Sequence, residues 1–189
     1  AISGAGPAGT ALAIHLGRAG FRVALFDRAT FPREKPCGEG LMPLGVAALD
    51  ELGVPTRDIG ADFFGVRYSA GGRVAQGDFP AGFSPGRGLR RRDLDAALAL
   101  LALRAPGVSL HTGACVTAPL LEDGCVRGLL VEGQPVRARL VVAADGAQSR
   151  LRHSLGLSLP APHKRVGMRM HFRSAAGTPV RTRVEIFLA

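Results

Sequence analysis

Apolar and polar residues first form a pattern that predicts a strand, a helix and a second strand in close succession. A glycine-rich turn at 4–9 follows a short apolar tail, and the apolar residues of 10–19 indicate a helix that Gly20 ends. The run 21–26 is largely apolar, which is typical of a strand buried in a parallel sheet, and Asp27 follows it directly. The unit takes about 30 residues, the length expected of a βαβ half.

The next part of the chain predicts a loop, two helices and a hairpin. Residues 28–40 are rich in Pro, Gly and charge and indicate a loop, and 44–52 has the pattern of a short amphipathic helix. The stretches 63–68 and 73–79 flank a pair of glycines, as the strands of a β-hairpin do. A second long helix is expected at 91–104, with leucines on one face.

Short strands dominate the second half of the chain. Three or four are expected between 108 and 143 as a β-meander, and the apolar run 139–144 is expected to return to the first sheet. Residues 165–173 and 181–188 predict strands of a second sheet that faces the substrate. Together the elements predict an α/β fold: a Rossmann-like domain with an inserted β-meander, and the start of a mostly antiparallel β domain.

The glycine turn carries the clearest chemistry. Gly4 permits a tight turn, Gly6 lets the backbone approach a pyrophosphate at the positive end of a helix, and Gly9 lets that helix pack on the strand. Asp27 lies 23 positions after Gly4 (27 − 4), where a carboxylate accepts hydrogen bonds from an adenosine ribose. An acid here favours a ribose 2′-OH and repels a 2′-phosphate, so this first site suits FAD or NAD and not NADP.

The formal net charge of +9 raises the question of a nucleic-acid partner. The positive charge is almost all Arg, scattered along the chain, and aromatic residues do not interleave with it as a stacking platform would require. An anionic cofactor or substrate is therefore the better interpretation, and no nucleic acid is expected. A non-catalytic basic binding module stays open as an alternative.

The cysteines and histidines indicate which structural sites and which cellular compartment to expect. The odd number and the spacing of the three cysteines argue against a disulfide framework and a zinc site, which fits a reducing cytoplasm, and the histidines lack metal-ligand spacing, so no metal is expected. No apolar run reaches the roughly 20 residues of a membrane span, while peripheral membrane contact stays open. No signal peptide is visible, although the chain opens inside a motif.

Four sets of residues, in this order, resemble the FAD-dependent aromatic-hydroxylase type of flavoprotein monooxygenase and its relatives, the geranylgeranyl reductases and the flavin-dependent halogenases. They cover about residues 1–155, which makes the resemblance fairly specific. The sets are the glycine turn at 4–9, Asp27-Arg28 with Phe31-Pro32-Arg33, Arg91-x-x-Leu94-Asp95, and Asp145-Gly146 with Ser149 and Arg152.

The resemblance implies a role for each matching position. Arg91 is expected to reach the phosphate and ribityl region of the flavin, and the backbone at Val116 to lie near the adenine. Asp145 and Gly146 are expected beside the pyrophosphate, where the superfamily also handles NAD(P)H. The full cofactor-binding set is Gly4, Gly6, Pro7, Ala8, Gly9, Asp27, Arg28, Cys37, Gly38, Arg91, Val116, Asp145 and Gly146.

The motif at 35–43, Lys-Pro-Cys-Gly-Glu-Gly-Leu-x-Pro, resembles the loop that passes close to the flavin ring in geranylgeranyl reductases and several related monooxygenases. Cys37 is therefore expected near the isoalloxazine, as a small, buried, inert residue rather than a redox-active one. Glu39 is expected to be a solvated loop acid rather than a proton donor. The sequence does not identify a catalytic acid or base, so the catalytic residues stay unknown.

The resemblance divides the chain into an FAD-binding domain at 1–160, with 60–90 reaching toward the substrate sheet, and partial strands of a substrate domain at 161–189. The second flavin motif of the family is a Gly-Asp pair far toward the C-terminus, and the sequence to Ala189 has no segment that corresponds to it, so a C-terminal part of the enzyme is expected beyond it. FAD is expected as the cofactor rather than NAD because of the β-meander, since a simple NAD dehydrogenase continues with alternating strands and helices.

The expected activity is that of an FAD-dependent oxidoreductase. A monooxygenase that hydroxylates an apolar or aromatic small molecule with NAD(P)H and O2 is the leading hypothesis. The alternatives are a geranylgeranyl-reductase-like enzyme that reduces C=C bonds, a flavin-dependent halogenase and a bare NAD-binding domain. The halogenase motif Trp-x-Trp-x-Ile-Pro is missing, and the sequence has no Trp.

Overall fold

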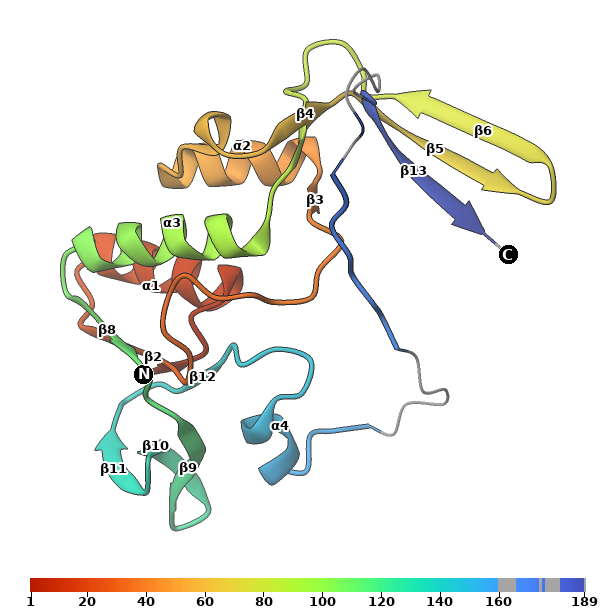
Figure 1. Ribbon diagram of the computed structural model, residues 1–189. Coiled ribbons are helices and arrows are strands. Elements are labelled where there is room, and N and C mark those ends of the chain that lie inside the picture. Colours follow the sequence, from red (N-terminus) through yellow and green to blue (C-terminus); the bar gives the residue numbers. More distant parts are fainter. Residues whose placement is uncertain (160–165, 174, 176–180, 189) are drawn as a thin grey trace. The chain divides into compact units, whose positions relative to one another are not determined.

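The computed structural model describes residues 1–159, 166–173, 175 and 181–188. The chain divides into two compact units, of which the first contains 1–34 and 94–166 and the second contains 35–93 and 167–189. Figure 1 labels most of the helices and strands of both units.

The first unit is built on a four-stranded sheet in the order β12-β1-β2-β8, and all neighbouring strands are parallel. The strands are β1 (Ile2–Ser3), β2 (Val23–Asp27), β8 (Val108–Thr112) and β12 (Val142–Ala143). Helix α1 (Pro7–Arg18) connects β1 to β2, as the predicted βαβ unit requires.

Helix α1 forms at this place because its first residues suit a helix start. Pro7 occupies the first turn, where its missing N–H costs nothing, and buried Ala13 and Ile14 give the helix one apolar face. Gly17 is required for close packing, since a Cβ there would lie 2.4 Å from the Pro106 carbonyl oxygen, just before β8. The same helix therefore contacts β1, β2 and β8.

An antiparallel sheet follows β8 and packs against the face of β2. It consists of β9 (Val116–Glu122), β10 (Cys125–Val131) and β11 (Gln134–Arg137) in the order β11-β10-β9. Phe26 of β2, Leu129 of β10 and Leu151 of the short helix α4 (Arg150–Ser154) form its buried core. This is the predicted β-meander, except that its first expected strand, β8, instead lies in the parallel sheet.

Helix α3 (Arg91–Arg104) matches its predicted bounds, with Leu94, Leu98 and Ala102 buried along one side. Its first residues belong to the second unit and the rest to the first. The apolar spacing of three and four positions explains why this segment is helical. In the part of the chain that the structure describes, no helix has both the length and the apolar character needed to cross a bilayer.

The second unit contains a small antiparallel sheet in the order β3-β7-β4, formed by β3 (Gly40–Leu41), β7 (Gly86–Gly88) and β4 (Ala61–Phe63). Helix α2 (Pro43–Leu52) and a 3-10 turn (Thr56–Asp58) lie between β3 and β4 along the chain. This sheet is secured by one buried residue of β7. The guanidinium of Arg87 donates to Asp62 at 2.5 Å and to the carbonyl oxygens of Arg57 and Ile59 at 2.9 and 3.1 Å.

The predicted hairpin is present as β5 (Gly65–Ala70) and β6 (Arg73–Asp78), and β13 (Arg183–Leu188) pairs with β5 in parallel. Arg183 of β13 reaches across β5 to Asp78 of β6, with two contacts of 2.6 and 2.7 Å. Gly65 leaves room for this pair, because a Cβ there would lie 2.6 Å from the Asp78 Oδ1. The strand predicted at 181–188 is confirmed.

Two expected strands differ from the structure. Residues 166–173 have no regular secondary structure, so the strand predicted at 165–173 is wrong over this range, and residue 165 lies outside the described residues. Apolar residues suit a strand locally, but a strand also needs a neighbour for its backbone hydrogen bonds. The returning strand is shorter than predicted and comprises only Val142–Ala143.

Candidate cofactor site

The glycine turn of the first unit passes directly over the backbone at the end of β12. Gly4 has a φ of 99° and donates its N–H to the Phe26 carbonyl at 2.7 Å. A Cβ on Gly4 would lie 2.4 Å from the Ala144 oxygen, and a Cβ on Gly9 would lie 1.9 Å from the Gly4 oxygen. Only glycine fits at both positions, and the turn therefore lies beside Asp145 as the chain leaves β12.

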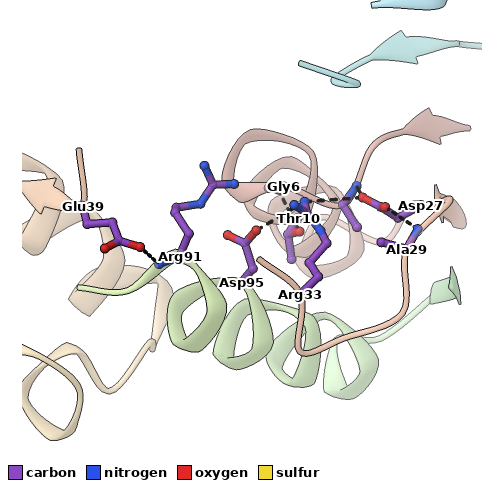
Figure 2. A network of polar contacts seen from close by, with 9 residues as sticks. Gly6, Thr10, Asp27, Ala29, Arg33, Glu39, Arg91 and Asp95 are labelled. Carbon is purple, nitrogen blue, oxygen red and sulfur yellow. Dashed lines mark hydrogen bonds and ion pairs between the residues drawn. The ribbon is translucent and has the colours of Figure 1, made fainter. Parts of the chain in front are cut away.

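Asp27 ends β2 with its carboxylate turned back toward the glycine turn, as Figure 2 shows. Its Oδ2 accepts the Ala5 N–H at 2.9 Å and its Oδ1 accepts the Ala29 N–H at 2.9 Å. The side chain is 10% exposed. Each carboxylate oxygen has a further lone pair, so the group can still accept from a ribose hydroxyl.

Arg33 lies between two carboxylates of the first unit (Figure 2). Its guanidinium is 3.2 Å from the Asp95 Oδ2 and 3.6 Å from the Asp27 Oδ2, and it stands 5.2 Å from the centre of the Phe31 ring. The Asp95 side chain has no exposed surface, so its charge needs a close partner. Arg33 and Asp95 belong to two of the family-like motifs, but no functional role was predicted for either residue. Their opposite charges in two separate motifs were the signal for this pair.

Asp145 follows β12, and only one of its two carboxylate oxygens accepts a hydrogen bond among the described residues. Its Oδ2 accepts the Arg150 N–H at 3.0 Å at the start of α4. Its Oδ1 is buried and has no hydrogen-bond partner among the described residues. A buried acceptor without a donor is costly, so this oxygen marks a place that suits a ligand hydroxyl or amide. Gly146 follows with a φ of 88° and is exposed.

Val116 begins β9 and packs against the cluster around Phe26. The preceding residue, Cys115, lies 3.3 Å from the Arg150 guanidinium, and His111 stacks on Phe26 with ring centres 4.8 Å apart. These contacts place the expected adenine-side residue on the same core that supports β2.

The segment 35–39, at the end of the loop that follows β2, belongs to the second unit, and two of its residues differ from expectation. Cys37 is exposed, so the expectation of a buried cysteine is wrong; residues 34–38 are all exposed, and this segment therefore offers Cys37 no buried position. Glu39 is not a solvated acid, since its side chain is only 13% exposed. It accepts the Arg91 N–H at 3.0 Å and contacts Arg169 and the His171 Nε2, the latter at 2.7 Å (Figure 2 shows the Arg91 contact).

The electrostatics of Glu39 follow from these partners. Burial alone raises its pKa, but hydrogen bonds from His171 and the Arg91 amide, together with the charge of Arg169, outweigh burial and hold the pKa below its ordinary value. The group is therefore ionised at neutral pH. Sequence reasoning missed its role because Arg169 and His171 are 130 and 132 positions away.

The structure thus distributes the predicted residues over both units. The first unit brings Gly4, Gly9, Asp27 and Asp145 to one edge of the parallel sheet, the edge at which β1, β2 and β12 end. Gly6, Pro7, Ala8, Arg28, Val116 and Gly146 also belong to the first unit, and Cys37, Gly38 and Arg91 belong to the second.

Known proteins resemble this chain over most of its length. The sequence is 38% identical over 162 residues to a menaquinone reductase of Mycobacterium tuberculosis, covering 82% of this chain and 39% of that protein. It is 34% identical to digeranylgeranylglycerophospholipid reductase 2 of Methanopyrus kandleri, over 82% of this chain and 39% of that protein. It is also 34% identical to a 6-methylpretetramide 4-monooxygenase of Streptomyces rimosus, over 82% of this chain and 40% of that protein.

A solved structure shows the same fold. The myxobacterial FAD-dependent halogenase CndH superposes with a TM-score of 0.71 at 26% identity, over 81% of this chain and 38% of that one. The chain spans about two fifths of the length of the three curated relatives named above. A sequence profile described as the FAD binding domain matches residues 1–185. The chain therefore belongs to the FAD binding domain family of flavin-dependent oxidoreductases.

Proposed function

We propose that the chain is the FAD-binding part of a flavin-dependent reductase that saturates carbon–carbon double bonds of an isoprenoid lipid or lipid quinone. The observation that carries this proposal is the similarity to the M. tuberculosis and M. kandleri reductases, which spans the loop motif at 35–43 and reaches 38% identity. The sequence pattern alone favoured a monooxygenase, and the reductase relatives shift the balance.

The residues of the first unit fit the ADP half of FAD. Gly6 is the residue directly before α1, where the positive end of a helix stabilises a pyrophosphate, and Gly4 and Gly9 allow the tight turn and close packing that shape this end. The Asp27 carboxylate would accept from the adenosine ribose, and the buried Asp145 Oδ1 would gain the donor that it lacks among the described residues. The net charge of +9 favours a cofactor that carries two phosphates.

Other residues would support this arrangement. Arg33 neutralises Asp95 and steadies Asp27, so that the ribose acceptor keeps its orientation. Val116 would lie beside the adenine. For Arg91, Cys37 and Gly38, the proposed contacts with the flavin rest on the family resemblance.

When bound, FAD would supply the redox chemistry, that is, the transfer of electrons from a donor such as NAD(P)H to the substrate. Saturation of one double bond consumes a hydride and a proton, and NAD(P)H becomes NAD(P)+. The protein would contribute binding, orientation and exclusion of water. Peripheral contact with a membrane would give the enzyme access to a lipid substrate.

A monooxygenase is the second candidate, because the S. rimosus monooxygenase is 34% identical over 82% of the chain. A halogenase is less favoured, since its support comes from solved structures at 25–26% identity and the sequence has no Trp.

The two candidates differ in their need for O2. The test uses the full-length protein with NADPH or NADH and a panel of polyprenyl lipids and aromatic acceptors, with and without O2. The proposal predicts products that gain two hydrogens per saturated bond in the absence of O2. Turnover that requires O2, with one 18O atom from labelled O2 in the product, would contradict the reductase and support the monooxygenase.

A further inference from the structure

Glu39 has a backbone conformation that a residue with a side chain adopts at a cost. Its φ is 58°, in the left-handed region, between the glycines at 38 and 40. Such conformations persist when the surrounding contacts determine them, and they gather at functional loops. This backbone turn directs the carboxylate toward the start of α3, where its Oε1 meets the Arg91 amide.

The contacts of Glu39 join three segments of the second unit that are far apart in sequence. Its carboxylate accepts the Arg91 N–H, 52 positions later, and pairs with Arg169 and His171 on the segment 167–173. Its backbone carbonyl also accepts the Leu89 N–H at 2.8 Å, just before α3. The loop that contains Cys37, the first turn of α3 and the segment 167–173 therefore meet at one carboxylate.

The location of this carboxylate has a physical consequence for α3. The first amides of a helix lack partners within the helix, and an anion near them is stabilised by the helix dipole. Glu39 supplies that anion from a distant loop and is itself held by two basic side chains. A surface ion pair would do less, because this side chain is 13% exposed and Arg169 is 21% exposed.

We propose that Glu39 is a positioning residue: its carboxylate clamps the 35–41 loop to the start of α3 and to the segment 167–173, and so fixes the loop that carries Cys37 and Gly38. This inference rests on the proposed function in one respect, namely that this loop lies near the flavin. Glu39 is thus neither a proton donor nor a solvated acid. The clamp sets the environment of the flavin without reacting with the substrate.

Three variants of the full-length protein test the clamp. Glu39→Ala removes all three side-chain contacts, whereas Glu39→Gln keeps an oxygen for the Arg91 amide and loses the charge that pairs with Arg169. Glu51→Gln is the matched control, because Glu51 is an exposed acid of α2. Hydrogen exchange of peptides that contain the Arg91 amide is measured together with the fluorescence and absorption of bound flavin, and with the urea midpoint of unfolding.

The clamp predicts about tenfold faster exchange at the Arg91 amide in Glu39→Ala, the size of effect expected when a helix loses its N-terminal cap. In Glu39→Gln and in the Glu51→Gln control, the Arg91 amide should exchange its hydrogen at the wild-type rate. The clamp also predicts that Glu39→Ala and Glu39→Gln both alter flavin fluorescence, because each releases the 167–173 segment, and that Glu51→Gln does not.

The proposal is overturned if Glu39→Ala exchanges the Arg91 amide at the wild-type rate, or if flavin fluorescence in both Glu39 variants equals that of the wild type. A change only in the urea midpoint, with flavin signals unaltered, would also overturn it, since that is a purely structural role. If the wild type failed to bind flavin, the proposed function would be contradicted instead. The clamp would still be tested by comparing hydrogen exchange at the Arg91 amide in Glu39→Ala and the wild type.

Discussion

Gly9 is the position at which the smallest change should have the largest effect on the cofactor site. In Gly9→Ala the new Cβ would lie 1.9 Å from the Gly4 carbonyl oxygen, whereas ordinary contacts begin at 3.4 Å. The start of α1 and the glycine turn must therefore separate by about 1.5 Å, the difference between 3.4 and 1.9 Å. The obstructing group is the Gly4 backbone carbonyl, so no side-chain rotation relieves the clash.

The expected cost has two parts. Overpacking of this kind destabilises a fold by about 1–3 kcal/mol, and the rigid backbone on both sides favours the upper end. A shift of this size also takes backbone donors out of hydrogen-bonding range of the proposed pyrophosphate. Loss of one hydrogen bond to a charged group costs about 1.5–3 kcal/mol, which weakens FAD binding by roughly 10- to 100-fold.

The assay is urea unfolding together with FAD titration, and the control is Gly77→Ala. Gly77 lies in β6, and a Cβ there meets nothing within 4 Å. The control should unfold at or slightly above the wild-type midpoint and bind FAD normally, because alanine reduces the freedom of the unfolded chain. If Gly9→Ala bound FAD as tightly as the control and unfolded at the same midpoint, the close approach at the turn would be refuted.

Three further predictions concern charged residues. Arg33→Met leaves the fully buried Asp95 without its guanidinium and should destabilise the protein by about 3 kcal/mol in urea unfolding; an unchanged midpoint would contradict the pairing. Asp145→Ala should weaken FAD binding by more than about tenfold in a titration, and affinity equal to the wild type would remove Asp145 from the site. The lowered pKa of Glu39 means that it stabilises the folded state above the ordinary carboxyl pKa, and that this contribution is lost as the pH falls through the lowered value. Urea midpoints between about pH 7 and pH 3 should therefore fall less steeply in Glu39→Gln than in the wild type, and parallel curves would contradict the assignment.

The parts of the fold that could be predicted from the sequence are those that local rules determine. The turn at 4–9, α1 and β2 follow from glycine spacing and apolar periodicity within one short unit, and α3 follows from its leucine face. The predicted position of Asp27 is confirmed for the same reason: it directly follows a buried strand. The sequence also predicted the hairpin of β5 and β6, where paired glycines mark the turn.

The rest depends on contacts that no local pattern contains. Residues 166–173 have apolar positions suited to a strand, yet the described residues give them no strand partner. The role of Glu39 depends on Arg169 and His171, more than 100 positions away, and the burial of Asp95 depends on Arg33. The exposure of Cys37 likewise reflects the neighbours of its loop and not its own apolar character.

The most direct test of the central claim is the absorption spectrum of the purified full-length protein, recorded before and after titration with FAD, with NAD+ titrated in parallel. The account predicts flavin absorption bands that remain with the protein on gel filtration, at about one FAD per chain. It also predicts that NAD+ does not displace FAD from this site. A protein that shows no flavin bands even after FAD is added would contradict the assignment of the glycine turn, Asp27 and Asp145 as an FAD site.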